Sequence, residues 1–380
     1  MKKQKIAIIG DGLTGLTTAS ALKSLNVDID LFYKKNNKIG KYDRRTTAIS
    51  ESNFKFLHDE LKIIKKEYFW PCNKINLYYE NDSGYSNFLN FDQSKKNLMY
   101  IFENDKLKKY LFKKLKKIKN IKFISQPIKK IEHDKSIIKY LRKTKNYDLI
   151  LLCVGNNLDY YNAIVNNRFI KKNYNETSIT CCVTANINIK NASQYFLKEG
   201  PLAILPFQKN VFSVVWSLNN KFYFKNLNNL KKLILDKLNY IYGSKIKFKL
   251  SNIQSFPIFL VLYSKYFKKN SLILGEALHR VHPMAGQGFN LVLRDIKKLY
   301  ENIKANLKIG LPIKNSLILQ NFYKSRKPEN ILISLGIDLT NSFFKPNKYL
   351  KPVKEIIINN IQHNKIIKEI SRRVSNSGLY

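Results

Sequence analysis

The chain has 380 residues, of which 44% are hydrophobic and 13% aromatic, so it can bury a large core and is not disordered as a whole. A formal charge of +41 would suit nucleic acid or an anionic membrane surface. However, Lys is abundant together with Asn, Ile, Phe and Tyr, a bias that A/T-rich codons produce, and no nucleic-acid-binding motif appears. We therefore interpret the excess charge as mostly solvated surface and expect no nucleic-acid partner.

The cysteine pattern and the hydropathy bear on location. Cys72, Cys153, Cys181 and Cys182 form no C-x-x-C pair, so neither a zinc site nor a disulfide framework is predicted. The apolar run after MKKQK is too short for a signal peptide, and no stretch approaches 18 apolar residues. We expect a cytoplasmic protein, and attraction to anionic lipid at the inner face of the membrane stays open.

The first 33 residues follow the order strand, glycine turn, helix, strand. A β-branched run at 5–9 ends in GDGLTG, residues 16–25 have helical spacing, and VDIDLFY (27–33) alternates like a strand. This order opens a βαβ unit with a parallel sheet.

The glycine turn has the G-x-G-x-x-G pattern in the context that the motif requires. Gly10 permits the tight turn, Gly12 lets a pyrophosphate approach the backbone, and Gly15 allows the helix to pack on the strand. The turn therefore predicts dinucleotide binding; the alternative is a glycine turn without a ligand. Tyr33 stands where a ribose-binding carboxylate is expected, and its hydroxyl or its ring could take over by contacting ribose or adenine.

Farther along the chain, the α/β pattern is interrupted. We expect a helix in 47–63, a strand at 73–80, a helix over 104–118 capped by Asn104 or Asp105, and a buried parallel strand at 147–155. From about 160 to 260 the pattern is of strands without long helices between them, after which SLILG (271–275) restores the α/β character and the remainder is largely helical.

These segments predict an α/β fold in which a Rossmann-like domain with a parallel sheet is interleaved with a mostly antiparallel sheet domain. The nucleotide domain would be discontinuous and comprise residues 1–70, 96–160 and 262–345. The sheet domain would comprise 71–95 and 161–261, and residues 346–380 would form a C-terminal helical segment.

A second glycine-rich stretch, SLILGEALHRVHPMAGQGFNLVLRD, occupies residues 271–295. A nicotinamide dehydrogenase needs no second glycine loop, whereas a flavin, with its long ribityl and isoalloxazine portion, reaches a second wall. His279 and His282 are spaced i, i+3, but they have no H-E-x-x-H pattern and no companion ligands, so a metal site is not expected.

The stretch GEALHRVHPMAGQGFNLVLRDI resembles the second FAD motif of class A flavin monooxygenases, the group that includes para-hydroxybenzoate hydroxylase, and within it the ubiquinone-biosynthesis hydroxylases. Further segments resemble that group in order along nearly the whole chain: YDRRTTAIS (42–50), GPLAILPF (200–207), VVWSL (214–218), FPI (256–258) and NFYKSRKPEN (321–330).

The resemblance implies FAD as cofactor and a set of residues around it. The cofactor-binding residues would be Gly10, Gly12, Leu13, Thr14, Gly15, Arg45, Gly155, Gly275, Glu276, Pro283, Gly286, Gln287, Gly288, Phe289 and Asn290, and the loop residues His282 and Pro283 would be the catalytic candidates. Glu276 would contact the ribityl hydroxyls where the group usually has Asp. Cys153-Val154-Gly155 replaces the usual Ala-Asp-Gly and keeps only the glycine.

The implied activity is hydroxylation of a prenylated phenol in ubiquinone biosynthesis. In the group, NAD(P)H reduces the flavin, O2 adds to form a C4a-hydroperoxide, and its distal oxygen is transferred to the ring. Only one G-x-G-x-x-G is present, so we expect no separate nicotinamide domain. Two alternatives stay open: another FAD enzyme of the same fold, such as a prenyl reductase, or a non-catalytic scaffold subunit. Association with the membrane or a quinone-biosynthesis complex is likewise open.

Overall fold

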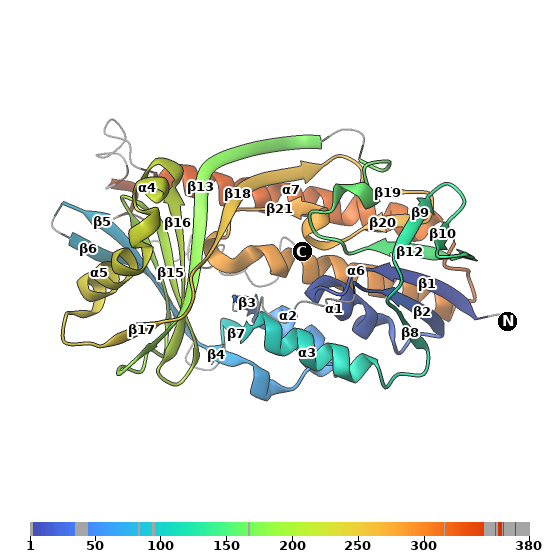
Figure 1. Cartoon of the computed structure of the whole chain (residues 1–380), viewed down its shortest axis with the longest axis horizontal. Coiled ribbons are helices and arrows are strands. Elements are labelled where there is room, and N and C mark those ends of the chain that lie inside the picture. Colours follow the sequence, from blue (N-terminus) through green and yellow to red (C-terminus); the bar gives the residue numbers. More distant parts are fainter. Residues whose placement is uncertain are drawn as a thin grey trace.

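The computed structural model describes residues 3–34, 45–82, 84–92, 96–165, 168–314 and 316–345, together with 354, 356–358, 360 and 369. Two lobes lie at opposite ends of the long axis (Figure 1). One is built on a six-stranded sheet that contains the N-terminal strand, the other on a nine-stranded sheet. The predicted C-terminal helical segment lies outside the described residues except at the six isolated positions.

The six-stranded sheet has the order β19-β20-β12-β1-β2-β8. Its strands are parallel except β19. Their bounds are β1 Gln4–Ile9, β2 Val27–Phe32, β8 Ile121–Ile124, β12 Leu149–Leu152, β19 Phe267–Lys268 and β20 Ser271–Ile273. All four residues of β12 are buried, as a continuous apolar run requires in a parallel strand covered on both faces.

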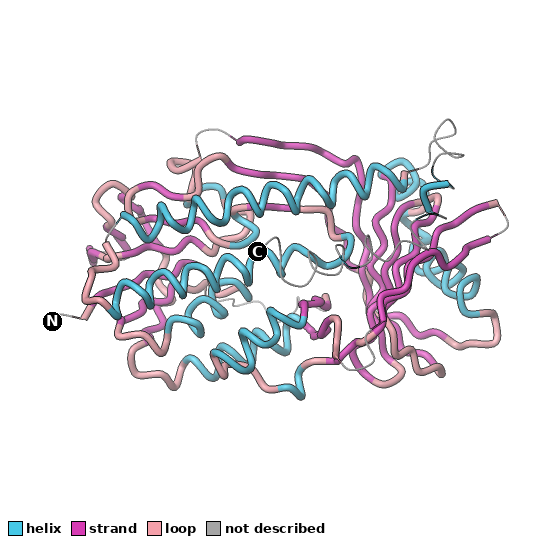
Figure 2. Tube along the Cα trace, turned by 180° about the vertical axis from the view of Figure 1, so that it is seen from behind, coloured by secondary structure: helices cyan, strands magenta, loops and turns pink. Residues whose placement is uncertain are grey.

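Helices and a small antiparallel sheet surround these strands. The long helices α1 (Leu13–Leu22), α3 (Asn104–Leu115) and α6 (Gln287–Lys308) lie close together (Figure 1). Helix α7 (Ser316–Phe344) packs on α6 and runs along the molecule to the second lobe (Figure 2). Strands β9 (Ile128–Glu132), β10 (Ile137–Tyr140) and β11 (Lys143–Asn146) form a separate meander. The meander packs on the parallel sheet through Tyr140, whose ring lies 5.2 Å from that of Phe32.

The nine-stranded sheet has the order β21-β18-β13-β16-β15-β14-β5-β6, and β17 also pairs with β13. Only the β14–β5 pair is parallel. The bounds are β5 Lys74–Asn81, β6 Gly84–Asp92, β13 Arg168–Ala185, β14 Ala192–Leu197, β15 Gly200–Gln208, β16 Val211–Asn219, β17 Phe248–Leu250, β18 Gln254–Tyr263 and β21 His279–Arg280. Helices α4 (Asn220–Lys225) and α5 (Leu230–Tyr242) bury one face, where Trp216, Ile234 and Leu238 belong to one apolar cluster.

A second three-stranded sheet lies between the lobes in the order β3-β7-β4. The remaining elements are β3 Thr46–Ser50, β4 Trp70–Cys72, β7 Met99–Glu103, α2 Glu51–Lys55, the π-helix η1 Phe56–Glu60, and the 3₁₀ turns η2 Lys66–Tyr68, η3 Leu158–Tyr160, η4 Leu227–Asn229, η5 Gly275–Ala277 and η6 Met284–Gly286. In the described part of the chain, no helix has the length and apolar content to cross a membrane.

Three expectations about local structure were wrong. Residues 47–63 do not form one helix, because Thr46–Ser50 pairs with β7 as a strand before α2 begins. Neither Asn104 nor Asp105 caps α3: the N-cap position is Glu103, and Asn104 instead accepts a hydrogen bond from the Thr47 hydroxyl at 2.6 Å. The sheet lobe also contains the 13-residue helix α5, whose apolar side chains cover the sheet.

Candidate functional site

A cavity of about 1570 Å³ lies between the two lobes. It is lined by the first turns of α1 and α6, by β3, and by one face of the nine-stranded sheet. Pockets for a single drug-sized ligand are on the order of 300–1,000 Å³, so this cavity has room for more than one small molecule. Its position between the lobes brings both glycine-rich loops to one site.

The glycines of the first turn differ in what surrounds them. A Cβ at Gly10 would lie 2.3 Å from the carbonyl oxygen of Cys153, and one at Gly15 would lie 1.9 Å from the carbonyl oxygen of Gly10. A Cβ at Gly12 would meet no atom within 4 Å, and Gly12 lines the cavity. Gly10 and Gly15 thus allow strand, turn and helix to pack, whereas Gly12 leaves backbone open to a ligand.

The two helices that begin at the glycine loops have no side-chain cap. The N-cap of α1 is Gly12 and that of α6 is Gly286, neither helix has an acidic residue in its first turn, and Gly286 adopts a left-handed conformation with φ +61°. The first N–H groups of a helix lack partners within it, and the helix dipole places partial positive charge there. The cavity is therefore suited to an anionic or electron-rich ligand at two separate points.

The two glycine loops touch each other. Gly275 has φ +79°, and a Cβ there would lie 2.7 Å from the side chain of Thr14 on the first turn of α1. The next residue, Glu276, is exposed and lines the cavity. A carboxylate that can accept hydrogen bonds thus lies at the junction of the two loops.

Asn290 holds the second loop against β3. Its side-chain oxygen accepts hydrogen bonds from the Ser50 N–H and the Asn53 amide, both at 2.8 Å. Its nitrogen donates to the carbonyl oxygens of Ala48 at 3.1 Å and Gly286 at 3.0 Å. Although Asn290 lines the cavity, these four bonds occupy its amide, so the protein itself uses the residue to position Gly286.

His282 is fully buried and both of its ring nitrogens are engaged. The Met284 N–H donates to Nδ1 at 3.2 Å, so the proton is on Nε2, which donates to Glu176 at 2.8 Å. Burial disfavours charge on Glu176, but His282 and Lys345 hold the pKa of its carboxyl below its ordinary value; Lys345 lies 2.5 Å from it. The cluster therefore connects β13, the second glycine loop and the end of α7.

His279 belongs to a different buried cluster. Its Nε2 lies 2.8 Å from Asp295, which also accepts from Arg326 Nε at 2.7 Å and from the Asn330 amide at 3.2 Å. Arg326 also pairs with Glu329, and Glu329 with Arg294, all of them buried. This cluster ties the loop that carries Glu276 to α6 and α7. The described residues contain no group of three or more His, Cys, Asp or Glu side chains that could hold a metal ion.

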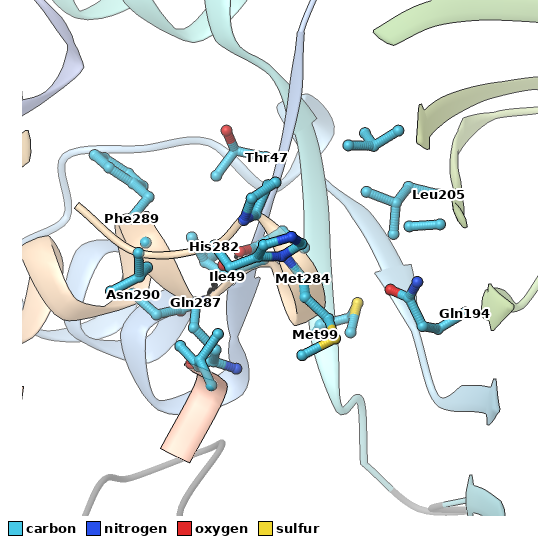
Figure 3. A pocket seen from close by; sticks show the side chains of 18 of the residues that line it. Thr47, Ile49, Met99, Gln194, Leu205, His282, Met284, Gln287, Phe289 and Asn290 are labelled. Atoms are coloured by element: carbon cyan, nitrogen blue, oxygen red, sulfur yellow. Dashed lines mark hydrogen bonds between the residues drawn. The ribbon is translucent and has the colours of Figure 1, made fainter. Parts of the chain in front are cut away.

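Most of the residues predicted from the sequence line the same cavity. They are Gly12, Leu13, Thr14, Arg45, Gly155, Glu276, His282, Pro283, Gly286, Gln287, Gly288, Phe289 and Asn290, and several appear in Figure 3. Gly10, Gly15 and Gly275 are in the packing around it. Arg45, directly before β3, lies over the ring of Phe256 on β18 at 4.8 Å.

Tyr33 does not line the cavity. Its ring packs edge-on against Phe112 at 5.6 Å and Phe123 at 6.0 Å, so the suggestion that it replaces the missing carboxylate finds no support in its position. Lys108 was missed: it lines the cavity and pairs with Asp11 at 3.2 Å. Its place one helical turn after Asn104 on α3 was the available signal.

The wall formed by the sheet is mainly apolar. The strands contribute Ile75, Leu77, Phe88, Phe196, Leu205, Val215 and Ile258, and α7 contributes Ile333, Ile337 and Phe344. Polar side chains on this wall are few, among them Ser178, Thr180 and Gln194. The cavity thus has a polar end between the glycine loops and an apolar end between the sheet and α7.

Comparisons with known proteins agree with this geometry. Residues 190–310 match the family described as "FAD binding domain". The chain is 28% identical over 220 residues to the mitochondrial ubiquinone biosynthesis monooxygenase COQ6 of Dictyostelium discoideum, covering 46% of this chain and 44% of the relative. It is also 28% identical over 171 residues to the ubiquinone hydroxylase UbiL of Rhodospirillum rubrum, covering 42% and 38%.

The fold matches that of p-nitrophenol 4-monooxygenase PnpA from Pseudomonas putida with a TM-score of 0.78 at 12% identity, covering 97% of this chain and 96% of that one. The predicted fold class and the resemblance to FAD-dependent monooxygenases of ubiquinone biosynthesis are confirmed. The matched part spans less than half the length of each of the two relatives.

Proposed function

We propose that this chain, which is similar to FAD-dependent monooxygenases of ubiquinone biosynthesis, hydroxylates a prenylated phenol with NAD(P)H and O2. The observation that carries the proposal is the cavity itself. Two uncapped helix N-termini open into it from the glycine loops, and an apolar wall lies opposite them. A protein that only binds a nucleotide would need the helix N-terminus at the first glycine loop, but neither the second N-terminus nor the apolar wall.

The residues around the polar end fit FAD. The open backbone at Gly12 and the first turn of α1 would hold the diphosphate, with Leu13 and Thr14 beside it. Glu276 would hold the ribityl hydroxyls, and Arg45 and Gly155 also line the cavity. Gly10, Gly15 and Gly275 would act indirectly, by letting the loops pack this closely.

The second loop would hold the isoalloxazine ring along Pro283, Gly286, Gln287, Gly288 and Phe289. Bound FAD, once reduced by NAD(P)H, supplies the activation of O2. The partial positive charge at the N-terminus of α6 would favour negative charge on the ring edge that lies against it.

His282 and Asn290 would fix the loop rather than react. The Nε2 proton of His282 is held by Glu176 and its Nδ1 by the Met284 N–H, so in this arrangement neither nitrogen is free to transfer a proton to a substrate. The amide of Asn290 is likewise fully used. Backbone geometry is what this loop would contribute to the reaction.

The apolar end of the cavity suits a prenyl tail. Phe88, Phe196, Ile333, Ile337 and Phe344 form its walls and offer no charge. An aromatic ring near Met284 would then lie beside the loop while its tail extends toward α7. Burial of apolar surface contributes about 25 cal/mol per Å², so a tail of several isoprene units would dominate substrate affinity.

Two further proposals concern the domain division and the place of action. The division into an FAD domain (1–70, 96–160, 262–345) and a substrate domain (71–95, 161–261) is supported by the six- and nine-stranded sheets, which follow it except at β21, and by their main apolar clusters. Leu332 and Leu339 are exposed on α7 where it borders the cavity, which supports work at the inner face of a membrane, where a prenylated substrate partitions.

A second candidate function is a non-catalytic scaffold. The position of Tyr33 favours it. Tyr33 stands where a ribose-binding carboxylate is expected, and it does not line the cavity. One experiment separates the candidates: the purified protein is examined for a flavin absorbance spectrum, and NAD(P)H oxidation is measured with and without a prenylphenol. The enzyme predicts bound FAD and oxidation stimulated by the phenol. A protein that takes up no FAD, or whose oxidation ignores the phenol, contradicts it.

A further inference from the structure

Gln194 stands out on the apolar wall of the cavity. The cavity-lining residues of β14 are Ala192, Ser193, Gln194 and Phe196, and three of them, with Gln194 in the middle, occupy alternate positions of the strand. Tyr195, between them in sequence, belongs to the cluster under α5 and stacks on Tyr78 with ring centroids 4.6 Å apart. Strand alternation thus points Gln194 to the cavity and Tyr195 away from it.

The neighbours of Gln194 on the sheet are apolar. Its strand partners are Leu77 on β5 and Ala203 on β15, and both also line the cavity. Ala192 belongs to the cluster of Ala48, Cys72 and Ile101. On the other side, Phe196 belongs to the cluster of Phe88, Met284 and Ile333. A carboxamide therefore stands between two apolar clusters.

The amide of Gln194 opens onto the cavity and has no protein partner. Gln194 is 8% exposed, and within the described part of the chain its side chain makes no hydrogen bond, although its amide is not sealed off from the cavity. A buried polar group that is not hydrogen-bonded is unfavourable, and most such groups in folded proteins have a partner. Figure 3 shows Gln194 across the cavity from Met284 and His282 of the second loop, with Met99 and Leu205 nearby. The missing partner can come from a molecule that occupies the cavity.

We propose that Gln194 binds the ring hydroxyl of the phenol substrate and so determines which ring carbon faces the second glycine loop. This rests on the proposed function and adds a specificity-determining residue to it. A carboxamide both donates and accepts, and so does a phenol hydroxyl, so the two can pair. Phe196 lies about 7 Å farther along β14, because a strand rises about 3.3 Å per residue. A hydroxyl held at Gln194 thus directs an adjoining tail onto the Phe196 cluster.

Selectivity for a phenol over a hydrocarbon of the same shape would come from the hydrogen bond to Gln194. A substrate with the hydroxyl satisfies the amide, whereas a hydrocarbon of the same shape leaves it unpaired, and a site built to pair a hydroxyl rejects the analogue that lacks it. The apolar wall alone would bind both ligands equally.

The test compares binding of 2-geranylphenol and geranylbenzene to the FAD-loaded protein by titration calorimetry, without NAD(P)H. The chain as it stands is expected to bind the phenol about tenfold more tightly, the usual value of one hydrogen bond. Gln194→Leu is expected to bind the two probes alike, through weaker phenol binding and unchanged or tighter hydrocarbon binding. Because Leu suits the apolar surroundings, its melting temperature should stay the same or rise.

Two further variants complete the design. Tyr195→Phe, on the opposite face of the same strand, should keep the full preference for the phenol. Gln194→Glu, as a carboxylate, can accept from a hydroxyl but cannot donate to an ether, so it should bind 2-geranylphenol about as the unaltered chain does and bind its methyl ether about tenfold more weakly than the unaltered chain does. A Gln194→Leu protein with an undiminished preference for the phenol, or an unaltered chain that binds both probes equally, overturns the inference. Failure of the proposed function is seen separately, as absence of FAD or of phenol-stimulated NAD(P)H oxidation in the unaltered chain.

Discussion

At the scale of single residues, the three glycines of the first turn meet different physical requirements. Gly10 and Gly15 are needed by the protein, because any side chain there would overlap backbone oxygens. Gly12 is not, since a Cβ would enter open space and its φ of −69° suits any residue. The sequence motif predicted separate roles for the three glycines, and the structure shows the backbone overlaps that exclude side chains at Gly10 and Gly15.

This separation predicts opposite outcomes for matched substitutions. Gly12→Ala should leave the free energy of unfolding within about 0.5 kcal/mol. It should weaken FAD binding about tenfold or more, because the methyl group occupies the approach to the α1 N-terminus. Gly15→Ala should destabilise the protein by at least about 1–3 kcal/mol through overlap. Thermal unfolding of the FAD-free proteins and fluorescence titration with FAD measure the two effects. A Gly12→Ala protein that binds FAD normally would contradict the assignment.

At the scale of elements, Glu176 joins three parts of the chain. It lies on β13, accepts a hydrogen bond from His282 of the second loop and pairs with Lys345 just after α7. Because the loop runs directly from His282 through Pro283 into the α6 N-terminus, this contact fixes where the N–H groups of α6 point.

Removing the carboxylate should therefore disturb the cofactor loop. Glu176→Ala leaves the His282 N–H buried without an acceptor, at a cost of about 1–3 kcal/mol, and should lower FAD affinity. Glu176→Gln keeps an acceptor for His282 and loses only the attraction for Lys345, so its FAD affinity should fall less. Titration with FAD ranks the three proteins. Equal affinities in all three would show that the loop keeps its position without this contact.

The buried cluster around Asp295 predicts a pH dependence. Burial disfavours its charge, yet Arg326 and His279 hold the pKa of Asp295 below its ordinary value. A lowered pKa in the folded state stabilises the fold above the unfolded pKa of about 3.9, and this contribution is lost as the pH falls through the lower folded value.

Asp295→Asn should therefore be clearly less stable than the unaltered chain at pH 6, and the difference should shrink as the pH falls below about 4. Melting temperatures of the two proteins between pH 7 and pH 3 measure it. A difference that stays constant over that range would mean that the charge of Asp295 contributes nothing to the contact between α6 and α7.

At the scale of the whole molecule, the sequence predicted what local patterns can encode. The parallel sheet, the two glycine loops and the resemblance in GEALHRVHPMAGQGFNLVLRDI indicated the fold, and most residues named from them line one cavity. Contacts between distant segments could not be predicted from these local patterns. Nothing in the sequence places Glu176 beside His282, 106 residues away, or directs Gln194 toward the loop of Met284.

Some local errors have a physical origin as well. Residues 46–50 have enough helix-compatible neighbours to look helical, but pairing with β7 makes them a strand. The helix α5 was not predicted, because residues 230–242 lie within a segment whose other apolar runs indicate strands. Their own apolar residues nevertheless have helical spacing. In both cases tertiary contacts decided between two patterns that the sequence permits.

The proposed place of action also belongs to the whole molecule. The charge of +41 and the exposed Leu332 and Leu339 at the cavity predict binding to anionic vesicles that weakens as salt is raised. Leu332→Ser with Leu339→Ser should reduce vesicle binding in a sedimentation assay, while Leu227→Ser, at an exposed site on η4, should not. Equal binding to neutral and anionic vesicles would contradict the role of charge.

We propose that an oxygen atom passes from O2 to a prenylated phenol in the cavity between the lobes. The most direct measurement is mass spectrometry of the product after the FAD-loaded protein is incubated with NAD(P)H, a prenylphenol and oxygen-18 gas. A hydroxylated phenol that has gained one labelled oxygen atom is expected. Unchanged phenol, or a product whose new oxygen is unlabelled, would contradict it.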